Sequence, residues 1–510
     1  MRPAPLTLAL LPALALGLGE RGGVTDLRCE VGRNAIAAPS TLAPKKFERP
    51  PVGAIAPQGW LLEQLLLQSN SLAGYLSDSS FPGADHVNMS AWSGGDGSKA
   101  GGTDQWLPYW SNGQVPLLGL LEAAKATGRV ESDLGPIIDN LMSYVLAHTN
   151  TTNGWIGPFV DEPGDNNGHG LWDPLNMLRS LFMYAEFRPQ QEQAIAKAVV
   201  AHLTEESKLL VKDPVIKWAQ TRWPTFVEIC QYVVDYYVPK YGSKAEVMPL
   251  GAAGTTEMLM NASALFAQKG MNWLSYYHRN GSIKFPFADV HGWNTNDHGV
   301  NNAEGAVRWP AVTYRMTGRQ EDAEQMDYML GMLDKYQGQV QSLLCADEVF
   351  CGRAPHRGTE TCTEVEAMAS LEYAFEVFGT PNLMDRVERM AFNGKLERRT
   401  CESSSVVVLM RLVLVAAMPA ALTADMWTHV YVQQANSVFA GHTGPKASDA
   451  TQPLRSHHLH HSHQTHKKPC GGCGGGAPEL LGDTPSGEDQ GANFYGVSHF
   501  PCCITNFPQG

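Results

Sequence analysis

The feature that most constrains the fold is a helical repeat of apolar residues, which runs from Pro57 to about Ala435. Within this region apolar residues recur every three or four positions, the spacing that places them on one face of an α-helix. Clear examples are the stretches 59–76, 113–128, 173–187 and 364–379. Alternating strand patterns are scarce. The sequence therefore predicts an all-α fold.

Short loops rich in Gly, Pro and Asn separate these predicted helices and pair them into hairpins. Such hairpins bury one face of each helix pair either by closing into a toroid or by stacking into an α-solenoid. No repeat of fixed length is present, as a solenoid would require. A closed toroid is the favoured prediction. Three predicted helices end near Gly128, Gly318 and Gly379, where glycine is expected to take the left-handed conformation.

The N-terminus has the pattern of a secretory signal, predicted to span residues 1–19. Arg2 precedes an apolar run through Leu18, and small residues follow where a peptidase could cut. The run is short for a transmembrane anchor. Four Asn-x-Ser/Thr sequons, at Asn88, Asn150, Asn261 and Asn280, fit a secreted glycoprotein. We expect an extracellular protein.

Two segments differ from the rest of the predicted helical domain, 57–435. Segment 394–418 interrupts this domain. Its apolar part is too short for a membrane span and also contains the charged residue Arg411. Segment 436–490 is a low-complexity insertion rich in His and Gly, in which a Cys-Gly-Gly-Cys sequence could bind metal adventitiously. The final segment, 491–510, is assigned to the end of the catalytic region.

The formal net charge of −13 argues against nucleic acid or an anionic membrane as partner, because either would require a basic surface.

Three predicted loops, at 103–114, 153–174 and 289–305, are rich in Trp, His, Asn and Asp. Aromatic rings stack on sugars while the polar side chains bind hydroxyl groups, so these loops indicate a carbohydrate ligand. Ordinary polar loops are the alternative. The oligomeric state stays open.

Adjacent cysteines, Cys502 and Cys503, lie close to the end of the chain. A disulfide between neighbours strains the intervening peptide, whereas two adjacent thiolates suit a metal ion. Glu360 and Cys362 flank a single residue at the start of an amphipathic helix. Together the four residues form a possible tetrahedral zinc site.

Four sequences, "GTETCTEVEAM", "DEVF", "NDHGVNNAEGAVRWPAVTYRMTG" and "FPCCITN", resemble glycoside hydrolase family 127, the β-L-arabinofuranosidase-like proteins. The resemblance covers residues from about Pro57 to Asn506, apart from the two atypical segments. It implies an (α/α)6 barrel and a secreted, retaining hydrolase of fungal type. Family members continue into β-sandwich domains, so the resemblance also implies that the C-terminal domains are missing from this sequence.

The resemblance assigns roles to individual residues. Cys502 is the expected nucleophile and a ligand of Zn²⁺, with Cys503, Glu360 and Cys362 as the other ligands. Glu348 is the expected general acid and base, and the neighbouring acids Asp347, Glu364 and Glu366 are alternatives for this role. The substrate-binding residues are expected to include His298, Trp110 in the first aromatic loop, and Asn176, which stands where bacterial members carry a histidine.

Two other interpretations remain open. One is another helical-toroid carbohydrate hydrolase or lyase with structural cysteines. The other is a secreted sugar-binding protein without catalytic activity. The first interpretation predicts activity that survives removal of the thiols, whereas the zinc-dependent hydrolase would lose it. The second predicts that replacing Glu348 leaves sugar binding and every other measured property unchanged.

Overall fold

The computed structural model of the chain describes residues 38–70, 72–78, 87–95, 105–158, 169–278, 297–339, 342–347, 349–350, 358–395 and 432–434. The long helices are α2 (Gly59–Ser69), α4 (Trp106–Ala123), α5 (Leu134–Ala147), α6 (Asp173–Phe187), α7 (Glu192–Lys212), α8 (Lys217–Tyr232), α10 (Gly251–Lys269), α13 (Trp309–Thr317), α14 (Gln320–Gln337), α15 (Thr361–Phe378) and α16 (Pro381–Arg389). Shorter helices are α3 (Leu72–Tyr75), α9 (Val238–Tyr241), α11 (Trp273–Tyr277) and α12 (Gly299–Asn301). The labelled π-helical turns in the described residues are η6 (Val233–Tyr237), η8 (Asn302–Ala306) and η9 (Met390–Lys395). The predicted all-α class is confirmed in its main feature, since helices dominate the described residues.

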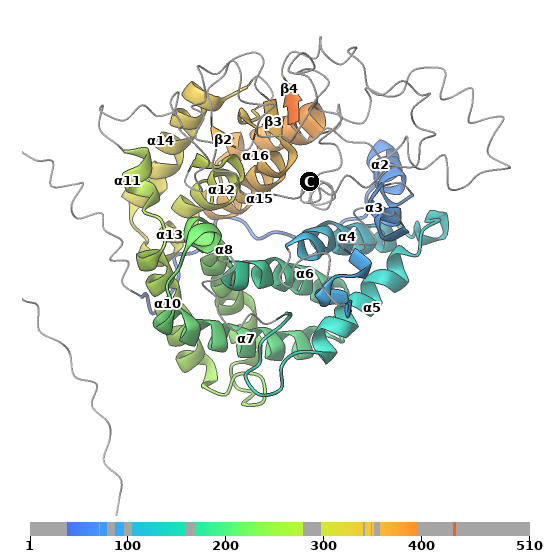
Figure 1. Ribbon diagram of the computed structural model, residues 1–510, viewed down its shortest axis with the longest axis horizontal. Coiled ribbons are helices and arrows are strands. Elements are labelled where there is room, and N and C mark those ends of the chain that lie inside the picture. The colour runs from blue at the N-terminus through green and yellow to red at the C-terminus, as the bar shows by residue number, and fades with distance from the viewer. Residues whose placement is uncertain are drawn as a thin grey trace, which may run out of the picture.

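These helices alternate between inner and outer positions. The inner helices α4, α6, α8, α13 and α15 are buried along most of their length, and in this order each packs against the next. Each also contacts an outer helix that follows it in the chain, namely α5, α7, α10, α14 and α16 respectively. Figure 1 shows α6 between α4 and α7. The described residues thus supply five inner and outer pairs. The sixfold ring of an (α/α)6 barrel needs a sixth pair of helices, so this barrel stays a prediction.

One small sheet of four strands accompanies the helices. Its order is β2 (Val349–Phe350), β1 (Ala346–Asp347), β3 (Gly358–Glu360) and β4 (Val432–Gln434). β1 pairs with β2 antiparallel and with β3 parallel, while β4 pairs antiparallel with β3. Because β3 ends at Glu360, immediately before α15 begins, the sheet fixes the start of that inner helix.

The helix predictions differ in their accuracy. Stretch 173–187 coincides with α6, and 364–379 lies almost entirely within α15. The predicted loop at 103–114 is wrong from residue 106 onward, because α4 begins there. The predicted loop at 289–305 turns into helix at residue 299. In both places buried polar residues in a helical segment give it the composition of a loop.

The predicted glycine turns are confirmed in two places. Gly318 and Gly379 follow α13 and α15 with φ of 64° and 69°. After α4 it is Lys125 that takes the left-handed conformation, with φ of 54°, while Gly128 lies in the short 3-10 helix η4 (Thr127–Arg129). A left-handed lysine is strained compared with glycine.

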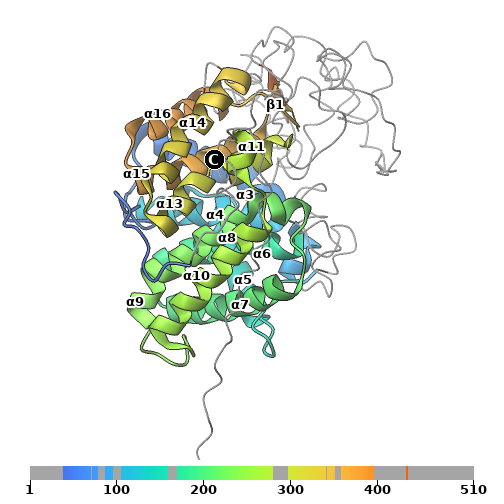
Figure 2. The same ribbon diagram turned by 90° about the vertical axis from the view of Figure 1, so that its left-hand side faces the viewer.

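The N-terminal segment, residues 43–53, binds the C-terminal parts of three inner helices. Ala43 N donates to Arg315 O of α13 at 2.7 Å, and Lys45 Nζ donates to Glu376 Oε2 of α15 at 2.8 Å. Arg49 Nη2 contacts Glu186 Oε1 of α6 at 2.6 Å. Figure 2 shows this segment, in blue, along the left-hand side, whereas β1 lies on the right. The segment therefore joins the inner helices at the end remote from the sheet.

A polar pair is buried in the outer helix α7. His202 and Glu206 are fully buried, with His202 Nε2 3.3 Å from Glu206 Oε2. His202 Nδ1 accepts the Ile156 N–H at 3.0 Å, so a neutral ring presents its proton toward Glu206. Burial lowers the pKa of His202 to about 3 and raises the pKa of Glu206 well above its usual value. Both side chains are therefore neutral in the folded protein near neutral pH.

Several predicted regions lie outside the described residues. They are the signal at 1–19, the insertion at 436–490, the final segment 491–510 and all of segment 394–418 beyond residue 395. Among the residues that are described, no helix has the length and apolar composition needed to cross a membrane.

The contact between Lys45 and Glu376 predicts a measurable contribution to stability. The Lys45 side chain is only 6 % exposed. Replacing Lys45 by Met keeps an apolar chain of similar length and removes the positive charge. We expect the free energy of unfolding to fall by about 2–3 kcal/mol, between the values typical of exposed and buried ion pairs. The matched control is Arg129→Met at the exposed pair with Glu63, which should leave stability nearly unchanged in urea denaturation. An equal loss of unfolding free energy in Lys45→Met and Arg129→Met would contradict a stabilising role for the N-terminal segment.

The buried Glu206 predicts a change in the pH dependence of stability. Its raised pKa means that the folded protein holds a proton which the unfolded chain releases above about pH 4.5, so the contribution of Glu206 to wild-type stability falls as pH rises beyond that value. A glutamine at this position cannot titrate. The stability of Glu206→Gln relative to wild type should therefore increase with pH, by up to about 1.4 kcal/mol per unit until the folded pKa is passed. A constant difference in stability between the two proteins from pH 5 to 8 would contradict it.

Candidate functional site

The N-terminal ends of the inner helices meet around a buried ion pair. Arg222 of α8 places Nη1 2.9 Å from Glu304 Oε2 of η8, and both residues are almost completely buried. Arg222 also donates from Nε to Asn301 Oδ1 at 2.6 Å and from Nη1 to the Tyr109 hydroxyl of α4 at 2.8 Å. One guanidinium group thus joins α4, α8 and the α12–η8 segment.

Glu304 has further partners from other helices. Trp172, the residue before α6, donates from Nε1 to Glu304 Oε1 at 3.0 Å, and Thr225 Oγ1 of α8 donates to the same oxygen at 2.7 Å. Burial alone would raise the pKa of Glu304, but Arg222 and Arg308 outweigh it and hold the pKa below its usual value. Glu304 is therefore a fixed negative charge at the centre of the inner helices.

Aromatic rings surround the Arg222 guanidinium. It lies 3.8 Å from the centre of the Trp172 ring and 5.1 Å from that of Trp218, within the range of a cation–π interaction. His298 meets Trp218 edge-to-face with ring centres 5.1 Å apart. Tyr109 meets Trp172 in the same manner at 5.8 Å. Indole and imidazole groups beside hydrogen-bonding side chains form the kind of surface that binds a sugar ring.

A kink in α8 gives Arg222 its position. Arg222 has non-helical φ and ψ of −105° and 16°, two residues before Pro224. Proline has no N–H, so the carbonyl of Gln220 loses its helical donor. The Met271 N–H donates to that carbonyl instead, at 2.8 Å. The hydrogen bond lost at the kink is therefore replaced by one from the segment that follows α10.

Gly305 allows η8 to lie against this kink. A Cβ atom at this position would be 2.1 Å from the Thr221 carbonyl oxygen, which no side chain can tolerate. The π-helical turn Asn302–Ala306 thus places Glu304 opposite Arg222 only because residue 305 has no side chain.

A second carboxyl group, Glu366, lies close to Glu304. Ser370, one turn further along α15, donates to the Glu304 carbonyl oxygen at 3.4 Å, so this face of α15 packs against η8. Glu366 is fully buried, and neither carboxyl oxygen has a hydrogen-bond partner within the described part of the chain. Burial and the charge of Glu304 raise the pKa of Glu366 to about 7, although Arg179 opposes the shift. Below about pH 7 a protonated Glu366 therefore lies next to the Glu304 carboxylate.

The predicted metal ligands Glu360 and Cys362 are brought together at the start of α15. Glu360 is the residue that precedes the helix, and Cys362 is in its first turn. Both are buried, with 2 % and 3 % of their surface exposed. Helix N-termini favour negative charge, which suits a carboxylate and a thiolate. Cys362 also lies close enough to Tyr109 to raise its pKa, although burial is the main cause of that shift.

The other half of the predicted metal site cannot be placed. Cys502, Cys503 and the predicted acid Glu348 lie outside the described residues. Within the described residues there is no group of three or more His, Cys, Asp or Glu side chains with the geometry of a metal site. Two of the four predicted ligands are thus near each other and buried, and the full set stays a prediction.

The predicted substrate-binding residues occupy different places. His298 is buried beside Trp218, immediately before α12. Asn176 follows Trp172 by about one turn, is fully buried, and its amide forms no hydrogen bond within the described part. Trp110 is also fully buried, but its Nε1 donates to the Ala73 carbonyl at 3.3 Å. The Trp110 indole therefore packs against α3.

Sequence reasoning missed the central residues Arg222 and Glu304, and it named Glu366 only as an alternative general acid. The available signal was a charged residue within an otherwise apolar helical stretch, as in "KWAQTRWPTF" for Arg222. Such residues are rarely buried without a partner. The hydrogen-bond partners that join α8 to the α12–η8 segment are 79 positions apart in the sequence, so the pattern could not name them.

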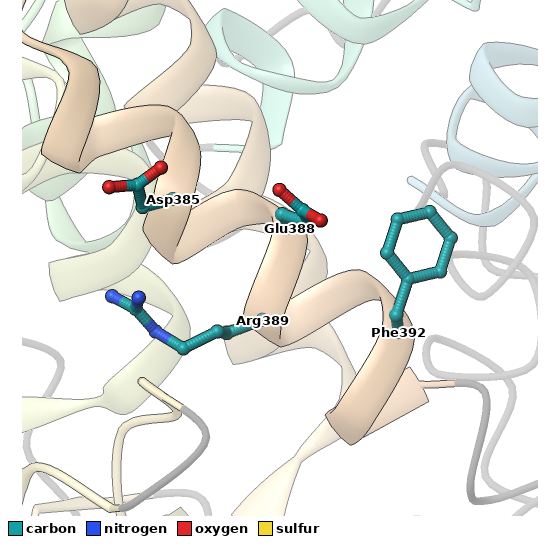
Figure 3. A pocket seen from close by; sticks show the side chains of 4 residues that line it. All are labelled: Asp385, Glu388, Arg389 and Phe392. Carbon is teal, nitrogen blue, oxygen red and sulfur yellow. The ribbon is translucent and has the colours of Figure 1, made fainter.

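A surface cavity of about 370 Å³ lies along α16. Asp385, Glu388, Arg389 and Phe392 line it, and Figure 3 shows their side chains along this helix and the turn that follows it. The exposed Trp60 ring of α2 meets Phe392 with ring centres 5.2 Å apart. The four lining residues recur at helical spacing on a solvent-facing surface, which is the ordinary composition of an outer helix.

Comparison with known proteins gave few matches. The scan against protein-family models found none, and the search among curated proteins also found none. A solved structure described as a glycoside hydrolase is similar, with 12 % sequence identity and a TM-score of 0.42. The similarity covers 77 % of this chain and 54 % of that chain. This chain therefore spans about half the length of the matched structure.

The Glu304–Glu366 pair predicts a coupled titration. Replacing Glu304 by Gln removes the like charge that helps to raise the pKa of Glu366, so this pKa should fall from about 7 by about one unit or more. Infrared spectroscopy of the protonated carboxyl band over pH 4–9 would measure it. Glu63→Gln, at an exposed residue of α2, is the control and should leave the midpoint unchanged. An unchanged or raised midpoint in Glu304→Gln would contradict the coupling.

Proposed function

We propose that this protein is a secreted, retaining glycoside hydrolase whose nucleophile is a zinc-bound cysteine. The proposed product is β-L-arabinofuranose or a related sugar, released from glycans or glycoproteins. The observation that carries the proposal is the placement of Glu360 and Cys362. The two are buried together at the first turn of an inner helix, beside the aromatic and polar site around Arg222.

The donor set fits zinc. Glu360 and Cys362 offer one carboxylate and one thiol in a buried position, and Cys502 with Cys503 would complete a set of three sulfurs and one oxygen. Bound zinc would keep these thiols as thiolates and protect them from oxidation outside the cell. Thr363 Oγ1 lies 3.5 Å from Glu360 Oε2 and would help to orient that carboxylate.

Retention of configuration requires two displacements at the anomeric carbon. In the proposed reaction the Cys502 thiolate attacks this carbon while Glu348 donates a proton to the leaving oxygen, and the glycosidic bond breaks. Glu348, now a carboxylate, then takes a proton from water. That water attacks the same carbon from the side opposite the sulfur and releases the sugar and the Cys502 thiolate.

The surroundings suit a sugar. Trp172 and Trp218 supply aromatic rings around Arg222, while His298 and the Asn176 amide, which has no partner among the described residues, offer hydrogen bonds. The furanose and its L-configuration rest on the motif resemblance alone. The buried side chains restrict only the ligand class, which is small, neutral or weakly charged, and rich in hydroxyl groups.

A second candidate function is favoured by the Glu304–Glu366 pair. Two neighbouring carboxyl groups with pKa values shifted in opposite directions are a known arrangement for acid–base hydrolysis of glycosides. In such an enzyme the cysteines would be structural. Glu366→Gln would then abolish turnover while the cysteine variants kept it, the reverse of the pattern expected for the proposed mechanism.

The proposal predicts different effects for two substitutions, measured with 4-nitrophenyl β-L-arabinofuranoside and with a natural-type oligosaccharide. Cys502→Ser should lower kcat by about 10⁴-fold or more, because serine is a far weaker nucleophile at neutral pH. Glu348→Gln should retain zinc and slow the natural-type substrate by about 10²- to 10⁴-fold, with a smaller effect on the nitrophenyl glycoside. The smaller effect reflects a leaving group that hardly needs a proton.

The matched control for the cysteine variant is Cys230→Ser. Cys230 is a fully buried cysteine of α8 whose thiol contacts Ser263 of the outer helix α10, so the same chemical change falls outside the proposed site. This variant should keep its turnover. Two outcomes would contradict the assigned roles: near-normal turnover by Cys502→Ser, or loss of zinc from Glu348→Gln, since that residue is proposed to contact the leaving group and no metal.

A further inference from the structure

Three of the four sequons named above lie in the described part of the chain, and their surroundings differ. Asn150 and Thr152 of one sequon are both exposed. In another, Asn88 donates from Nδ2 to the Ser77 carbonyl at 2.7 Å, and Ser90 is fully buried. In the third, Asn261 is exposed on α10, but Ser263, which completes the sequon, is fully buried.

The Asn150 side chain is held in one orientation by its own turn. Its Oδ1 accepts the N–H of Thr152 at 2.8 Å and of Asn153 at 3.3 Å. The backbone closes the same turn, since Gly154 N donates to Asn150 O at 2.7 Å and Asn150 N donates to Trp155 O at 2.8 Å. With the amide oxygen occupied in this way, the nitrogen is directed away from the turn, and it donates to no described residue.

We propose that Asn150 is a site of N-linked glycosylation. The glycan is attached through Nδ2 of the exposed Asn150, an atom that this turn does not use, and the hydroxyl residue of the same sequon is exposed as well. Asn150, Thr151 and Thr152 are all exposed in the turn that follows α5, so a bulky group on Asn150 leaves the buried core intact. The inference requires export through a secretory pathway and is independent of the proposed hydrolase activity.

The test is peptide mass mapping of the full chain expressed in a eukaryotic secretory host. Enzymatic removal of N-glycans in ¹⁸O-water should convert Asn150 into labelled aspartate. Asn150→Gln and Thr152→Ala should both lose this label, while Thr152→Ser should keep it. Asn153→Gln changes a neighbouring asparagine outside the sequon and should also keep it.

Two results would overturn the inference. One is an unmodified Asn150 in the recovered chain, whether or not another sequon carries a glycan. The other is a glycan mass that persists at this peptide in Thr152→Ala. Neither readout depends on catalytic activity, so failure of the proposed hydrolase function leaves this result interpretable.

Discussion

The ion pair between Arg222 and Glu304 is the interaction on which the interior of the inner helices depends. Both groups are removed from water, which is costly unless each charge is paired and its remaining hydrogen-bonding capacity is used. Arg222 meets this condition through Tyr109, Asn301 and two indole rings. Glu304 meets it through Trp172 and Thr225. Segments of α4, α6, α8 and η8 are thus tied to one point, beside the start of α15.

This arrangement depends on irregular backbone at two places. Pro224 accompanies a kink that turns Arg222 inward, and the π-helical turn that carries Glu304 approaches the kink because residue 305 is glycine. The N-terminal segment binds the opposite ends of the inner helices through Lys45 and Arg49. Fixed helix positions matter for the proposed chemistry, since the ligands at the start of α15 must stay aligned with side chains contributed by other helices.

The sequence predicted the helices better than it predicted the site. Helices α6 and α15 have a strong apolar period, and the turns at Gly318 and Gly379 follow from local conformation, so both could be read from adjacent residues. The predicted loop at 103–114 was wrong because buried polar side chains conceal the apolar period at the start of α4. Arg222 and Glu304 acquire their roles only through distant partners. The proximity of Glu360 and Cys362 was predictable because a single turn holds both.

The central claim is that a zinc ion is held by the thiolates of Cys362, Cys502 and Cys503 together with the Glu360 carboxylate. X-ray absorption spectroscopy at the zinc edge, on the purified full chain with its metal content measured in parallel, tests it most directly. The account predicts about one zinc per chain with a shell of three sulfurs at about 2.3 Å and one oxygen at about 2.0 Å. A chain that binds no zinc, or a shell of nitrogen and oxygen alone, would contradict it.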